Sequence, residues 1–179
     1  MPIVGKLLRR FRAGAQRSPL AAPEYAGAAT LDVTSAAFSE GAAIPQKHAG
    51  EAVGDNVSPP LQWSGVPAAA KQLALVIDDI DVPGPKPLMH TIAVFEPDRV
   101  GLSEGELSPG SPGVRFVKAF GDKYIGPAPI PGHGPHHYRF QVFALDEQVP
   151  DDVADHKAFL AAIAGHVLAR GTLTGTYER

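Results

Sequence analysis

Prolines and glycines are spread along almost the whole chain and limit the length of its regular elements. There are 18 prolines and 19 glycines among 179 residues. Proline breaks helices and central strands, and glycine favours turns, so we expect short elements joined by defined turns rather than a helical bundle. A chain of this length, with 44% hydrophobic residues, is expected to bury a core of its own.

Three segments predict the central strands of the fold. QLALVIDD (72–79) holds a continuous apolar run, YRFQVFAL (138–145) alternates apolar and polar residues, and HTIAVFE (90–96) is also strand-like. Shorter strand candidates lie at 31–35, 61–63, 114–120 and 172–178. Too few crossover helices are present for a doubly wound parallel sheet. The prediction is a mainly β fold, a β-rich α+β class with a largely antiparallel sheet and one or two peripheral helices.

One long helix is predicted near the carboxyl end. Asp155 is a suitable N-cap for HKAFLAAIAGHVLAR (156–170), and Gly171 is suited to end it. The apolar stripe of this helix consists of Phe159, Leu160, Ile163, Val167 and Leu168.

The amino-terminal segment differs from the rest of the chain in charge. Residues 1–17 contain five basic residues and no acid, which leaves eleven basic and nineteen acidic residues in 18–179, a net charge of −8. We expect residues 1–28 to form a basic arm and linker, and residues 29–179 to form a single domain. A domain this acidic is a poor binder of nucleic acid, because phosphate neutralisation needs clustered Lys and Arg.

The basic arm has the pattern of a short amphipathic helix. Val4, Leu7, Leu8 and Phe11 recur at helical spacing. The favoured interpretation is a terminal helix that docks on its own domain or on a partner subunit. The alternative is weak contact of residues 3–12 with an anionic membrane surface. Neither the apolar stretch of a secretory signal nor a membrane-span pattern is found, so the expected location is cytoplasmic.

Signatures of enzyme chemistry are missing from the sequence. Cysteine is absent, and there is no nucleophile elbow and no glycine-rich phosphate loop followed by lysine. The prediction is therefore a protein that is not an enzyme and needs no cofactor. A metal-dependent hydrolase is the minor alternative, with Asp79, Asp81, His90 and His136 as candidate ligands.

A first group of polar residues surrounds the end of strand 72–79. DDIDVPGPKPLMH (78–90) places Asp79 and Asp81 on one side of the extended chain, and a stiff loop then returns to His90. If the two flanking strands pair, these carboxylates and the imidazole meet at one end of the sheet. Solvated acids at a strand end are the alternative.

A second group lies in GPAPIPGHGPHHYRF (126–140). Its prolines hold the backbone extended, and its glycines allow close approach to a ligand. A rigid loop that offers isolated N–H donors beside imidazoles suits a small anion. The alternative is a turn with surface histidines.

Together the two segments resemble the phosphatidylethanolamine-binding protein (PEBP) family, in its bacterial branch described as Raf-kinase-inhibitor-like. DIDVP (79–83) is similar to the family's D-P-D-x-P box, and GPAPIPGHGPHHY (126–138) to its G-x-x-P-P-x-G-x-G-x-H-R-Y box. SPPLQW (58–63) and GTYE (175–178) also fit bacterial members. The resemblance implies a large antiparallel sheet packed on a smaller one, with a C-terminal helix and a small anion-binding cavity at one sheet end.

The residues that the resemblance assigns to this cavity are Asp79, Asp81, His90, Gly126, Ala128, Pro129, Ile130, His136 and Tyr138. It implies that His90 and His136 donate to the anion, that Asp79 orients an imidazole, and that His133 is exposed. Ile80 stands where the first box usually has proline. Ile130, His137, Leu88 and the short loop before His90 also depart from the family pattern, and these departures bear on the size of the ligand. By analogy with family members, the Lys86–Pro87 peptide bond is expected to be cis.

The function implied is a non-enzymatic binding protein for a small anionic ligand, such as phosphate, a phosphoethanolamine-like headgroup or a carboxylate. The alternative is an interaction protein that regulates a kinase or protease, with the pocket in a regulatory role. A protein partner is therefore conceivable, and by analogy the chain is expected to form a homodimer.

Overall fold

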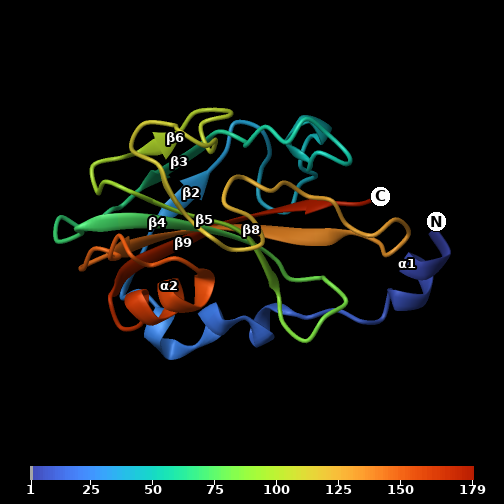
Figure 1. Ribbon diagram of the computed structural model, residues 1–179, viewed down its shortest axis with the longest axis horizontal. Coiled ribbons are helices and arrows are strands. Elements are labelled where there is room, and N and C mark those ends of the chain that lie inside the picture. Colours follow the sequence, from blue (N-terminus) through green and yellow to red (C-terminus); the bar gives the residue numbers. More distant parts are fainter. Residues whose placement is uncertain (1) are drawn as a thin grey trace.

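The computed structural model describes residues 2–179 (Figure 1). Its two α-helices are α1 (Pro2–Leu8) and α2 (His156–Ile163). The strands are β1 (Ala29–Thr30), β2 (Asp32–Thr34), β3 (Leu61–Ser64), β4 (Gln72–Asp79), β5 (Leu88–Phe95), β6 (Gly101–Leu102), β7 (Arg115–Val117), β8 (His136–Leu145) and β9 (Val167–Tyr177). The fold is mainly β, as predicted. Among the described residues, no helix has both the length and the apolar character needed to cross a bilayer.

The strands form two sheets of unequal size. The larger has the order β1-β9-β8-β4-β5-β7, and the smaller has the order β2-β3-β6. All pairings are antiparallel except that of β1 with β9. Figure 1 shows the large sheet nearly edge-on, with the small sheet on one side and α2 on the other. The two sheets and the peripheral helix therefore make three layers.

Each face of the large sheet buries its own hydrophobic core, and this explains the continuous apolar run of β4. Leu73, Leu75 and Ile77 pack toward the small sheet, against residues such as Trp63. Ala74 and Val76 alternate with them and pack toward α2. A strand covered on both faces has no polar side, as its sequence indicated.

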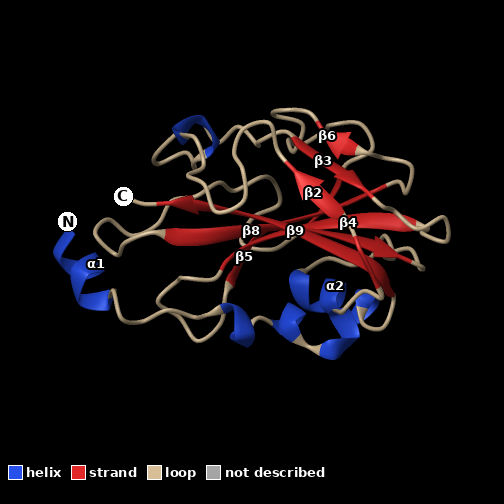
Figure 2. Cartoon of the chain, turned by 180° about the vertical axis from the view of Figure 1, so that it is seen from behind, coloured by secondary structure: helices blue, strands red, loops and turns tan. Residues whose placement is uncertain are grey.

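The segment 18–28, expected to be a linker, is packed against the domain. It contains two short 3₁₀ turns, Pro19–Ala21 and Pro23–Tyr25, each started by a proline. Leu20 is fully buried and Tyr25 nearly so, and both belong to the core on the α2 side. The backbone therefore reaches β1 along the surface of the domain, as Figure 2 also shows.

The predicted C-terminal helix is too long at its carboxyl end. Asp155 caps α2 as expected, and its carboxylate accepts hydrogen bonds from the amides of Lys157 and Ala158. The helix ends at Ile163, and Gly165 adopts a φ of +79° that reverses the chain. Val167 and Leu168 then begin β9, whose pairing with β8 overrides the helical spacing of the apolar residues.

Candidate functional site

The antiparallel pairing of β4 with β8 brings the two sequence boxes together at one end of the large sheet. Asp79 lies directly opposite Tyr138 in the register of these strands. β8 begins at His136, two residues earlier than predicted, and so carries the histidine of the second box into the sheet. Asp79, His136 and Tyr138 are 2%, 1% and 1% exposed. The titratable groups therefore meet in a buried environment.

A β-bulge places His90 in the same cluster. Ile77 pairs with Thr91 and Asp78 pairs with Met89, so His90 is the extra residue on β5. An extra residue of this kind changes the direction of a side chain relative to its neighbours. The His90 ring lies 5.5 Å from the Tyr138 ring, centre to centre and nearly perpendicular to it. No pattern in the sequence predicted this bulge.

A chain of hydrogen bonds runs from Asp79 to the amino-terminal arm. His136 Nδ1 lies 2.7 Å from Asp79 Oδ2, and His136 Nε2 lies 2.7 Å from His133 Nδ1. His133 Nε2 donates to the carbonyl oxygen of Leu8 over 2.8 Å. Both ring nitrogens of His136 are therefore occupied within the protein. The expectation that His133 is exposed is wrong, because this ring is fully buried between His136 and Leu8.

A count of protons shows that this row of hydrogen bonds, from Asp79 to Leu8, needs one proton more than two neutral imidazoles supply. Either one imidazole is protonated or the Asp79 carboxyl group is. Each of the three gaps needs one proton, and the Leu8 carbonyl supplies none. Two neutral imidazoles supply two protons, so one more is required. An imidazolium facing the Asp79 carboxylate meets the requirement, as does a protonated carboxyl group, and either state leaves the buried chain formally uncharged.

Asp81 belongs to a second, more exposed contact. Its Oδ2 accepts from the backbone amide and from Nδ1 of His137, both over 2.7 Å, and its Oδ1 lies 2.7 Å from Arg12 of the arm. These hydrogen bonds and the Arg12 charge lower the pKa of Asp81 despite its partial burial, which acts in the opposite direction as the largest single cause. His137 thus holds a carboxylate at the position where the family pattern has arginine.

Two polar atoms at the centre of the site have no partner. Among residues 2–179, five buried side-chain nitrogen or oxygen atoms lack a hydrogen bond, and two of them are His90 Nε2 and the Tyr138 hydroxyl. Buried polar atoms are seldom left unpaired, so two on neighbouring rings mark this place as unusual.

The protonation of these two groups follows from their surroundings. Burial lowers the pKa of His90, although the nearby Asp79 raises it in part. Its Nδ1 donates to the Ile125 carbonyl over 3.2 Å, which leaves Nε2 with a lone pair in the neutral ring. Burial, then the charge of Asp79 and the close approach of its carboxylate, raise the pKa of the Tyr138 phenol far above its usual value. The contact with Asp79 does not reach hydrogen-bond geometry. The Tyr138 hydroxyl and His90 Nε2 therefore offer one hydrogen-bond donor and one acceptor.

The loop 126–130 is held in place by residues that sequence reasoning missed. The Gly126 amide donates to Asn56 Oδ1, and Asn56 Nδ2 donates to the Tyr124 carbonyl, both over 2.9 Å. Asn56 has a φ of +54°, and its place in the turn-like DNVSPP segment was the available signal. A Cβ on Gly126 would lie 2.2 Å from the His48 carbonyl oxygen, so this position requires glycine.

The remaining predicted loop residues vary in burial. Pro129 is buried, Ile130 is half-buried and Ala128 is exposed. The Ala128 amide acts on the pKa of Tyr138, which places this part of the loop beside the phenol. None of the peptide bonds in residues 2–179 is cis, so the expectation of a cis Lys86–Pro87 bond is wrong.

One sizeable cavity lies outside this cluster. It has a volume of about 650 Å³ and lies between α2 and the start of β5, with Met89, Leu160 and Phe120 among its walls. Phe120 also contacts the outer side of the His90 ring, at 6.0 Å between ring centres. Because unpaired buried polar atoms are a more specific sign of a missing ligand than volume, we place the candidate site at His90 and Tyr138.

Comparison with known proteins identifies the family. The family model described as phosphatidylethanolamine-binding protein matches residues 34–178. The chain belongs to the PEBP family. Residues 1–33, which include the basic arm, lie outside the region that the family model matches.

Several relatives cover most of the PEBP domain. The UPF0098 protein of Methanothermobacter thermautotrophicus is 35% identical over 154 residues, which are 83% of this chain and 99% of the relative. The solved structure of the PEBP homolog CT736 from Chlamydia trachomatis is 33% identical, with a TM-score of 0.72, over 84% of this chain and 98% of that one. YbcL of E. coli, described as a member of the mammalian PEBP family, is 27% identical, with a TM-score of 0.77, over 84% and 99%.

Proposed function

We propose that this PEBP-family protein is a non-enzymatic binding protein that holds a phosphoryl or carboxylate group between His90 and Tyr138. The observation that carries the proposal is the pair of buried, unpartnered atoms, His90 Nε2 and the Tyr138 hydroxyl. An anion oxygen accepts from the phenol, and a protonated His90 or a proton on the ligand completes the second hydrogen bond. His136 has no free nitrogen, so its direct contact with an anion requires displacement of His133.

Tyr138→Phe tests this site without disturbing the fold. The hydroxyl makes no hydrogen bond of good geometry, and its polar neighbours are the Asp79 carboxylate and the Ala128 amide, so its loss is expected to change stability by less than about 1 kcal/mol. In the wild type, a bound anion raises the melting temperature by mass action. We expect the variant to bind inorganic phosphate, phosphoethanolamine and acetate about tenfold to a hundredfold more weakly, the value of one hydrogen bond to a charged group. The measurement is a thermal-shift titration with each anion.

Tyr124→Phe is the matched control. Tyr124 is equally buried, but its hydroxyl donates to the His48 carbonyl over 2.8 Å. This variant should lose about 1 kcal/mol of stability and keep its anion response. If no anion stabilises the wild type, or if Tyr138→Phe responds as strongly as Tyr124→Phe, the assignment of the site is wrong. A response to phosphoethanolamine but not to phosphate would identify a headgroup as the source of the anion.

The binding of sulfate is expected to weaken as pH rises. Burial lowers the pKa of His90, which favours the neutral ring near neutral pH, and sulfate carries no proton to donate there. Sulfate must therefore bind together with a proton that His90 takes up, which favours binding at low pH. Once the pH exceeds the pKa of His90 in the complex, affinity should fall about tenfold per pH unit. Calorimetry in buffers of different ionisation enthalpy measures this proton uptake, and a flat affinity between about pH 5 and pH 9 would exclude it.

A further inference from the structure

The amino-terminal arm is fixed to the domain at the candidate site. Ala13 and Gly14 donate backbone hydrogen bonds to Val82 and Ile80, over 3.0 and 2.8 Å. Arg12 bonds to the Pro135 carbonyl over 2.8 Å and to Asp81 over 2.7 Å. Figures 1 and 2 show α1 at the end of the molecule, beside the loop that precedes β8. The orientation of α1 is thus set by contacts along its inner side and at residues 12–14.

α1 contacts the loop before β8 through Gly5. Because glycine has no side chain, the backbones of the helix and the loop approach each other closely. A Cβ on Gly5 would lie 2.2 Å from the Pro131 carbonyl oxygen. Leu8 is partly buried, and its carbonyl accepts from His133. The favoured interpretation of the sequence, a helix that docks on its own domain, agrees with these contacts. It leaves the larger apolar residues of the helix on the other side.

The outer side of the arm is the main exposed apolar surface of the described chain. Among residues 2–179, six large apolar side chains are classed as exposed, and four of them lie between positions 3 and 11. They are Ile3 at 69%, Val4 at 53%, Leu7 at 74% and Phe11 at 62%. Isolated exposed apolar residues need no explanation, but a cluster of four marks an interaction surface.

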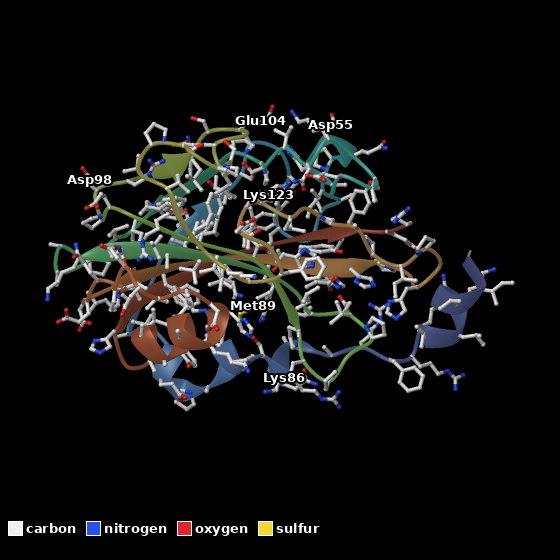
Figure 3. All side chains as sticks on the ribbon, viewed as in Figure 1. Asp55, Lys86, Met89, Asp98, Glu104 and Lys123 are labelled. Atoms are coloured by element: carbon white, nitrogen blue, oxygen red, sulfur yellow. The ribbon has the colours of Figure 1, made fainter. Side chains whose placement is uncertain are left out.

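The charge around this surface is basic. Lys6 and Arg10 are exposed and form no ion pair with any described residue. The acids labelled in Figure 3, Asp55, Asp98 and Glu104, lie along the upper edge of the view, and α1 lies at its right-hand end. A two-fold contact in which the arms of two copies face each other would bring their basic charges together, and these charges would repel. An anionic surface is complementary to both the charges and the apolar side chains.

We propose that the outer side of residues 3–11 is a docking surface for an anionic lipid bilayer. The side chains of Ile3, Leu7 and Phe11 enter the boundary between headgroups and acyl chains, and Lys6 and Arg10 contact lipid phosphates. Because the arm also contacts His133 and Asp81, docking places the candidate anion site beside the membrane surface. The proposal does not depend on the proposed function, since the apolar side chains face away from that site.

Flotation of the full chain with vesicles tests the proposal. We expect binding to vesicles of phosphatidylcholine with about one third phosphatidylglycerol, weak binding to phosphatidylcholine alone, and release by high salt. Leu7→Glu should lower the vesicle affinity at least about tenfold, because it removes buried apolar area and adds a negative charge. Val100→Glu is the matched control, since Val100 is also 74% exposed and lies on the loop before β6. It should bind as the wild type does.

Tyr138→Phe separates surface docking from the capture of one lipid in the candidate site. This variant should float like the wild type, whether or not it still binds phosphate. Its failure to float, equal losses in Leu7→Glu and Val100→Glu, or no binding of the wild type would each overturn the proposal. The remaining alternative is that a second copy of the chain occupies the surface, and sedimentation tests it. That alternative is supported if Leu7→Glu converts a dimer to a monomer and the wild type does not bind vesicles.

Discussion

His136→Ala is expected to lower the free energy of unfolding by about 3 to 5 kcal/mol, the cost of leaving one member of a buried ion pair unpaired. Asp79 is 2% exposed, and His136 Nδ1 at 2.7 Å is its charged or proton-sharing partner. Without that ring, the one hydrogen bond left to the buried carboxylate within residues 2–179 is from the Asp81 amide, at 2.8 Å from its Oδ1. The measurement is urea unfolding near neutral pH, with linear extrapolation to water.

Two further variants make this prediction specific. His137→Ala removes the neighbouring, half-exposed ring, and Arg12 still pairs with Asp81, so the loss should be about 1 kcal/mol or less. Asp79→Asn supplies an amide N–H in place of the missing proton, so two neutral rings and the amide fill all three gaps. That variant should also lose about 1 kcal/mol or less. A large loss of stability in Asp79→Asn would contradict the hydrogen bonds that we describe between Asp79, His136, His133 and Leu8.

Arg139→Ala is expected to cost about 3 kcal/mol through the same mechanism on the opposite face of the sheet. Asp78 is fully buried, and Arg139 binds it with two hydrogen bonds from directly across β4 and β8. Arg170 lies near this pair: burial and the Arg139 charge lower its pKa, while Asp78 raises it. Because Arg170 remains to face Asp78, we place the loss at the lower end of the range.

The double variant Asp78→Ala, Arg139→Met tests whether the stability loss in Arg139→Ala comes from an unpaired buried charge or only from lost packing contacts. Replacing both members by apolar groups removes the unpaired charge, so most of the single-variant loss should be recovered. The phosphate response should change much less than in Tyr138→Phe, because these side chains lie on the α2 side and Asp78 acts on His90 only through its charge. If the two single losses simply add in the double variant, the ion pair does not explain them.

Local patterns predicted the strands better than the helices. The bounds of β4 agree with the prediction because its continuous apolar run packs into both hydrophobic cores. The helix at 156–170 was predicted too long because Phe159, Leu160, Ile163, Val167 and Leu168 satisfy helical spacing across a turn at Gly165. β1 and β6 have two residues each, too short for any periodicity. Only pairing with neighbouring strands defines them.

The sequence predicted which residues form the candidate site, but not the hydrogen bonds between them. Asp79, His136 and Tyr138 meet because β4 and β8 pair in register. The strand patterns did not predict this pairing, and only the family resemblance placed the three residues in one cavity. The burial of His133 depends on a carbonyl 125 residues away in the chain, which no local pattern reveals. The direction of His90 depends on a bulge. Contacts of this kind are properties of tertiary packing and not of sequence spacing.

The ring nitrogens of His90 provide the most direct test of the anion site. Nuclear magnetic resonance of histidine-labelled protein can follow each imidazole nitrogen during a sulfate titration near neutral pH. We expect His90 Nε2 to change from an unprotonated to a protonated nitrogen as sulfate saturates, and we expect no such change in Tyr138→Phe at the same concentration. If His90 Nε2 stays unprotonated while sulfate binds, the anion lies elsewhere and the proposed site is wrong.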